Sequence, residues 1–352
     1  MTGAEHRERY LVNLQNSRNA YSGFGVAVTV LLLVHVCASY GLAYAVAYLL
    51  PEIYVQWWFN WVLNLVPLYG LAFPAFFLCL RHIEKGHHNS EYVSRGLVFD
   101  KPKFHFGIWC LLAVVGFGYM YIGHFMGNGL MGWISHLTGH DYQSGLANLA
   151  DTSPWWMILV GSVIIAPIGE ELMFRKLLID RARRYGDGTA ILSSSLLFAL
   201  FHGNLFQIFY AFFLGLIMGY MYTLSGKIRY SVALHMFINF MCMLVMPNLL
   251  GWLGLEDLAR IDPSDMEALN QVIAAHPVGY EIYRVVSMAV YGAMIAAIVL
   301  TIIFLCKRKI RLGQGEVHLR REDRMIAIFG NMGMPLCIFI LILYMVMNMI
   351  IV

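Results

Sequence analysis

Nine long apolar runs constrain the fold of this chain more than any other feature of its sequence. They lie at residues 22–50, 55–80, 104–126, 154–174, 190–206, 207–224, 230–250, 283–306 and 325–351. An α-helix needs about 20 residues to cross a bilayer, and most of these runs are that long. The run at 190–206 is short and adjoins its successor, so eight spans are the alternative if this run is re-entrant. The sequence therefore predicts an all-α fold, a polytopic transmembrane helix bundle.

The composition agrees with this class of protein. Hydrophobic residues make up 59% of the 352-residue chain and charged residues only 13%, proportions typical of a multi-span membrane protein rather than of two soluble domains. The six cysteines fall within or beside apolar runs, without a Cys-x-x-Cys or Cys/His zinc spacing. This pattern indicates neither a disulfide framework nor a structural zinc site.

The lysine and arginine residues predict the direction in which the helices cross. If the N-terminus is cytoplasmic, 22 of the 24 basic residues fall in inner segments, and only Arg260 and Arg284 fall outside. An excess of basic residues in short cytoplasmic loops is the usual determinant of orientation. The basic loop at 307–324 fits this topology and contact with anionic lipid, and we expect no binding of nucleic acid.

The runs divide the chain into three parts. Residues 1–153 hold three spans and an outer loop, residues 154–250 hold four spans that form the core, and residues 251–352 hold an outer loop and two further spans. The outer loop at 251–281 is acidic, and we expect a short surface helix in it. Two Gly-x-x-x-Gly patterns, at 123–127 and 215–219, indicate close helix packing rather than a dimer interface. The oligomeric state is left open.

Charged residues stand at the end of the fourth apolar run. Glu171 and Arg175 are four residues apart with the acid first, the favourable order for an ion pair along a helix. Glu170 points about 100° away from Glu171 on the helix. Charges at membrane depth are costly unless they are paired or hydrated, so they indicate a function. We interpret Glu171 and Arg175 as a supporting pair and Glu170 as the reactive group. The alternative is that both acids only mark a helix end.

Two later runs carry polar residues at the same four-residue spacing. Phe198 and His202 share one helix face, and His235 and Asn239 share another. Counted from the expected inner helix boundaries, Glu170 and both histidines lie at a similar depth of roughly 12 Å. The three helices can therefore bring these side chains together.

This set of side chains predicts hydrolysis. Glu170 and His202 can hold and deprotonate a water that attacks a carbonyl, while His235 and Asn239 donate hydrogen bonds to the developing oxyanion. The predicted reaction is hydrolysis of a peptide bond within the membrane without a covalent intermediate. Glu170, His202 and His235 could instead hold a catalytic zinc ion. We favour the metal-free alternative, with no required cofactor, because there is no His-Glu-x-x-His and asparagine is a poor zinc ligand.

The three motifs together resemble those of a known family. Glu-Glu-x-x-x-Arg at residues 170–175, Phe-x-x-x-His at 198–202 and His-x-x-x-Asn at 235–239 are similar to the motifs of the CPBP (CAAX protease and bacteriocin-processing, or Abi) family. This family includes the type II CAAX prenyl endopeptidases and is often described as metalloproteases. The resemblance covers about residues 155–245. It implies an intramembrane endopeptidase with catalytic Glu170, His202, His235 and Asn239.

Several functional alternatives stay open at this stage. The same cavity could serve a non-proteolytic membrane scaffold that binds a partner protein, or the histidines could form the relay of a proton-coupled transporter. The lack of an inverted repeat weighs against transport. The substrate could be a prenylated C-terminal peptide, a bacteriocin leader or another membrane-associated peptide. We expect a bacterial inner membrane, with the site toward the cytoplasmic leaflet.

Overall fold

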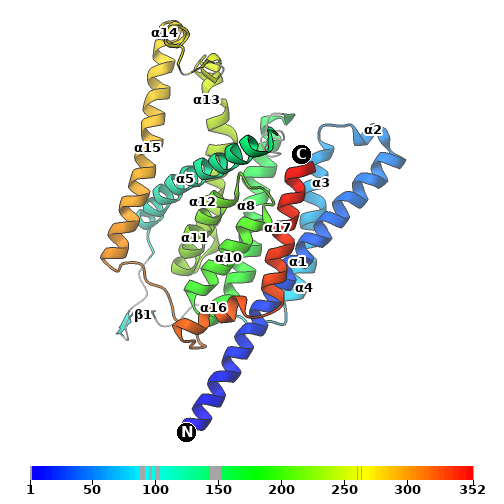
Figure 1. Ribbon diagram of the computed structural model, residues 1–352, viewed down its shortest axis with the longest axis vertical. Helices are drawn as coiled ribbons and strands as arrows, with labels where there is room; N and C mark the ends of the chain where they lie inside the picture. Colours follow the sequence, from blue (N-terminus) through cyan, green and yellow to red (C-terminus); the bar gives the residue numbers. More distant parts are fainter. Residues whose placement is uncertain are drawn as a thin grey trace.

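The protein is a bundle of long helices, as the sequence predicted. The computed structural model describes residues 2–87, 92–94, 97–99, 104–142, 152–259, 261–262 and 264–351. The N-terminus lies at one end of the bundle and the C-terminus toward the other (Figure 1). In the described part, the strands are limited to a short antiparallel hairpin, β1 (Tyr92–Ser94) and β2 (Leu97–Phe99).

The helical elements follow the predicted three-part division of the chain. The first part contains α1 (Gly3–Leu49), α2 (Pro51–Tyr54), α3 (Phe59–Leu65), η1 (Val66–Ala72), α4 (Phe73–Leu80) and α5 (Phe106–Thr138). The core contains α7 (Trp155–Ile158), η2 (Leu159–Ile165), α8 (Ala166–Glu171), η3 (Leu172–Ile179), α9 (Asp180–Ala182), η4 (Arg183–Tyr185), α10 (Asp187–Phe201), α11 (Ile208–Ser225), α12 (Ile228–Phe240), η5 (Met241–Val245) and α13 (Met246–Trp252). The last part contains η6 (Glu256–Ala259), α14 (Met266–Ala275), α15 (Pro277–Cys306), α16 (Arg321–Phe329) and α17 (Gly333–Ile351).

Eight helices in the described residues are long and apolar enough to cross a membrane. The ninth predicted run forms α10, which has only 15 residues and is shorter than a full span. Nearly all of α10 is buried. Its C-terminal end reaches Gly203, whose Cα lies close to the side chains of Tyr344 and Asn348 near the end of α17. This helix therefore returns the chain through the interior of the bundle without facing lipid.

Two predicted boundaries were wrong. The last apolar run is not one helix, because the chain breaks between α16 and α17, where Asn331 caps backbone groups on both sides of the break. Helix α5 continues to Thr138, into a segment that we expected to be loop; residues 143–151 lie outside the described residues. The short helix expected in the acidic outer loop is present as α14, and the side chain of Asp265 caps its N-terminus.

Proline residues explain where three helices widen. The π-helical segments η1, η2 and η5 are each followed by an α-helical segment with proline at its second position, namely Pro74, Pro167 and Pro247. A proline ring in a regular α-helix clashes with the carbonyl four residues earlier. Hydrogen bonds that reach back five residues avoid this clash, and π-bulges of this kind are often found at functional sites.

Ion pairs and backbone hydrogen bonds join distant segments at the N-terminal end of the bundle. The η4 turn contacts residues 313–317 through Val317 N–H, which donates to Arg184 O (3.0 Å), and through Asp187 N–H, which donates to Gly313 O (2.9 Å). Arg184 also pairs with Glu84 (2.6 Å) and Glu316 (3.7 Å). We call this group of contacts the basic-end clamp. It fastens the segment before α16 to the helix that carries the first motif.

Glu316 is ionised more readily within this clamp. Partial burial would raise the pKa of its carboxyl, but this effect is outweighed. Hydrogen bonds from the backbone and ring of His87, together with the charges of His87 and Arg184, hold the pKa below its usual value.

Glycine residues let neighbouring helices touch backbone to backbone. A Cβ atom on Gly123 of α5 would lie 2.4 Å from Tyr210 N of α11, and one on Gly127 would lie 2.4 Å from Phe206 O. A Cβ on Gly215 would likewise meet Ser195 of α10. Both Gly-x-x-x-Gly patterns therefore serve packing within one chain, which confirms the prediction.

We expect Gly123→Ala to lower the free energy of unfolding by about 1–3 kcal/mol, the usual cost of overpacking a close contact. The matched control is Gly129→Ala in the same helix, since a Cβ at Gly129 has nothing within 4 Å. Thermal unfolding in detergent would compare the two variants. Equal unfolding temperatures would contradict the proposed packing role.

Candidate active site

A buried ion pair lies at the centre of the site. Arg175 Nε lies 3.2 Å from Glu171 Oε2, and both side chains are fully buried. The spacing of four residues had predicted this pair. The Arg175 guanidinium also lies over the Phe198 ring, 4.3 Å from the ring centroid. The pair thus joins the first motif on α8 and η3 to the second motif on α10.

His235 lies between the two glutamates of the first motif. Its Nδ1 is 3.2 Å from Glu171 Oε1, and its Nε2 is 3.7 Å from Glu170 Oε2. Because the ionised Glu171 carboxylate can only accept, His235 must donate to it from a protonated Nδ1. The Nε2 atom then faces Glu170. The separation of 3.7 Å exceeds a direct hydrogen bond, so a water could bridge the two groups.

The two glutamates differ in exposure. The side chain of Glu170 keeps 19% of its surface exposed, whereas that of Glu171 has none. A water molecule can therefore reach Glu170 but not Glu171. This difference agrees with the separate roles expected for the two acids.

His202 is oriented by its own helix. Its Nδ1 lies 2.7 Å from Phe198 O, and because a carbonyl only accepts, Nδ1 carries the proton. In the neutral ring this leaves Nε2 as an acceptor, the form that a general base needs. The Phe198 ring contacts both imidazoles edge to face, with centroid distances of 4.7 Å to His202 and 5.9 Å to His235.

The pairing within the cluster differs from the expected one. We expected Glu170 beside His202, but among the described residues the imidazole within ion-pair distance of Glu170 is that of His235. Phe198 stands between the two histidines. A water shared by Glu170 and His202 would have to bridge a longer gap.

Asn239 is anchored on the first-motif helix. Its Nδ2 donates to Ser162 O at 2.8 Å. An amide NH₂ group carries two N–H donors, so one of them is left for another acceptor. The third motif therefore contacts the helix of the first motif through both of its residues.

Tyr69 of η1 also borders the site, and the sequence motifs did not point to it. Its ring occupies the space beside Gly169, where a Cβ would lie 2.1 Å from Tyr69 Cε1. Its hydroxyl donates a long hydrogen bond of 3.4 Å to Ala166 O, and the phenol lies within electrostatic range of Glu170. A glycine just before a paired acid in an apolar run was the one available signal that another side chain approaches there.

The described residues contain no group of three or more His, Cys, Asp or Glu side chains arranged to hold a metal ion. Of the three predicted zinc ligands, Glu170 and His235 lie close together, but Nδ1 of His235 is engaged by Glu171. His202 does not join them at ligand distance. The geometry thus brings together a pair of the expected ligands and not the full set.

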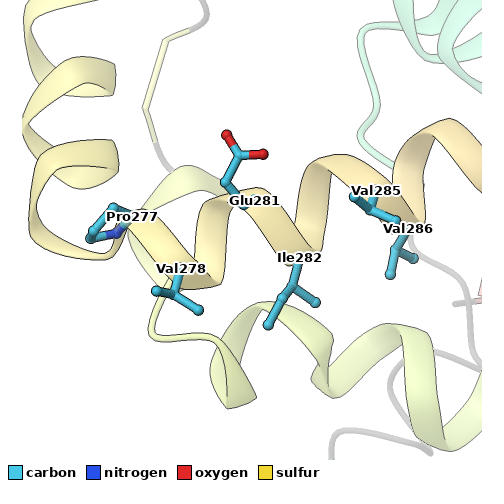
Figure 2. A pocket seen from close by; sticks show the side chains of 6 residues that line it. All are labelled: Pro277, Val278, Glu281, Ile282, Val285 and Val286. Carbon is cyan, nitrogen blue, oxygen red and sulfur yellow. The ribbon is translucent and has the colours of Figure 1, made fainter.

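A groove elsewhere in the molecule does not involve these residues. It runs along α15 at the end near α14 and is lined by Pro277, Val278, Glu281, Ile282, Val285 and Val286 (Figure 2). Its one carboxylate, Glu281, pairs with Arg284 at 2.5 Å. An apolar lining with a single paired carboxylate offers no catalytic groups.

The fold and the site define a polytopic helical membrane protein with a buried cluster of glutamate, histidine and arginine side chains. Residues 152–241 match the family model described as type II CAAX prenyl endopeptidase Rce1-like, and this segment belongs to that family. The matched segment contains all three motifs, which confirms the predicted resemblance. It supports a CAAX-type intramembrane endopeptidase as the general class, and the chain is an integral membrane protein. Searches of curated proteins and of solved structures found no match.

We expect Glu171→Gln to lower the free energy of unfolding by about 3–5 kcal/mol, because it leaves the buried Arg175 charge without its partner. The matched control is Glu281→Gln, which breaks the exposed pair with Arg284 and should cost less than about 1 kcal/mol. Denaturant unfolding in detergent would measure both. A Glu171→Gln protein of normal stability that has lost activity would mean that the roles of Glu170 and Glu171 are exchanged.

Proposed function

We propose that this protein is an intramembrane endopeptidase that hydrolyses a peptide bond of a membrane-associated substrate. The observation that carries the proposal is the exposure of Glu170. It is the acid of the pair that solvent reaches, and it faces an imidazole inside an otherwise buried cluster. A carboxylate placed in this way can take a proton from a bound water.

In the proposed reaction, Glu170 and His202 share the activation of water. The free Nε2 of His202 suits a general base, because Nδ1 is held by Phe198 O. The resulting hydroxide attacks the scissile carbonyl, and the proton taken up by the site then passes to the leaving amine. No covalent intermediate with the protein is formed.

His235 and Asn239 would stabilise the oxyanion of the tetrahedral intermediate. Asn239 has one N–H beyond the one donated to Ser162 O. When Nε2 of His235 carries a proton, it can donate as well, and the Glu171 carboxylate at Nδ1 offsets the charge of the doubly protonated ring. Fixed donors of this kind typically contribute about 10²–10³ in rate.

The family match supports a substrate at the membrane surface, and a prenylated C-terminal peptide fits its description. The basic-end clamp gathers arginine residues at one end of the bundle. We propose that this end faces the cytoplasm, by the same rule that governs basic loops, in a bacterial inner membrane. The membrane peptides that accumulate in cells with Glu170→Ala but not in wild-type cells, measured by mass spectrometry, would identify the substrate.

We expect Glu170→Ala and His202→Ala each to reduce cleavage of a reporter peptide by at least about 10²-fold while membrane insertion is unchanged. The matched control is His124→Ala. That histidine lies on α5 and bonds to Asn128, away from the cluster. Unchanged cleavage in the Glu170 variant would refute the catalytic assignment. A cellular phenotype that survives Glu170→Ala would favour a scaffold role.

The metal-dependent alternative is tested by the same reporter assay with purified protein and a strong chelator. We expect cleavage to be retained, since Nδ1 of His235 is engaged by Glu171 and His202 stands apart. Loss of activity with chelator and its return with added zinc would favour Glu170, His202 and His235 as ligands.

A further inference from the structure

A proline in the first-motif helix leaves one backbone carbonyl without its helical partner. In η2 the hydrogen bonds reach back five residues, and the last of them runs from Ala166 N–H to Gly161 O. The next bond in this series would run from residue 167 to Ser162 O. Residue 167 is proline, which has no N–H to donate.

The side chain of Asn239 takes the place of the missing donor. Its Nδ2 lies 2.8 Å from Ser162 O, the distance of a normal hydrogen bond. Asn239 belongs to α12, which packs against η2. A buried carbonyl without a partner is costly, so this site both attracts the amide and orients it.

We propose that Pro167 is a positioning residue that acts through Asn239. By freeing Ser162 O, it fixes one N–H of the amide and directs the second N–H toward the reacting carbonyl. The inference rests on the proposed function of Asn239 as an oxyanion donor. Pro167 itself touches no reacting atom.

The same arrangement of a π-helical segment and a proline occurs at Pro247, after η5. There the carbonyl that loses its donor belongs to Cys242. Pro247 is exposed, whereas Pro167 is buried. Pro247 is therefore a matched control for the backbone effect of removing a proline.

Pro167→Ala would restore an N–H that can bond to Ser162 O and displace the Asn239 amide. We expect kcat for a reporter peptide to fall about tenfold or more, with KM changed less than about twofold, since a misaligned donor affects the transition state. The unfolding temperature should stay equal or rise, because proline within a helix is unfavourable. Pro247→Ala should leave kcat within about twofold of wild type.

A double-mutant cycle tests whether the effect passes through Asn239. If it does, Pro167→Ala combined with Asn239→Ala should be no slower than Asn239→Ala alone. Losses that multiply in the double variant would overturn the proposal, because they would mean that Pro167 acts on Glu170 or on the helix as a whole. A lower unfolding temperature of Pro167→Ala would overturn it as well.

The two levels of the proposal fail in different ways. Full activity of Asn239→Ala would refute the oxyanion role of Asn239 within the proposed function. A large loss in Asn239→Ala together with full activity in Pro167→Ala would leave that role intact and refute only the positioning role of Pro167.

Discussion

The arrangement of the site depends on one charge pair held out of water. Glu171 and Arg175 lie 3.2 Å apart without exposed surface, where an unpaired charge would be very costly. Each partner also holds a residue from another helix. Arg175 lies over Phe198 of α10, and Glu171 accepts from His235 of α12. The pair that keeps its own helix intact thereby sets the positions of the second and third motifs.

Contacts within a helix could be predicted from the sequence, and contacts between helices could not. The spacing of Glu171 and Arg175 predicted their pairing because four residues make about one helical turn. The partner of Glu170 depends on how α8 and α12 are rotated and shifted against each other. No spacing encodes that relation, so His202 was expected beside Glu170 and His235 is found there. The approach of Tyr69 to Gly169 was missed for the same reason.

The spans were predictable because bilayer thickness sets the length of an apolar run. Hydropathy alone did not reveal the break between α16 and α17, where Asn331 satisfies the backbone within an apolar stretch. It also did not reveal the π-helical segments. These follow from single prolines in otherwise uniform runs, and their hydrogen-bond pattern depends on local geometry. The carbonyl of Ser162 and its contact with Asn239 are one result.

The short, enclosed helix α10 has a consequence for biosynthesis. With 15 residues and its serine hydroxyls turned back onto backbone carbonyls, it offers the translocon less than one full apolar segment. It packs closely against α11, with Gly215 in contact with Ser195. Helix α10 therefore depends on leaving the translocon as a hairpin with α11, so that the histidine of the second motif enters the bilayer already covered by a neighbour.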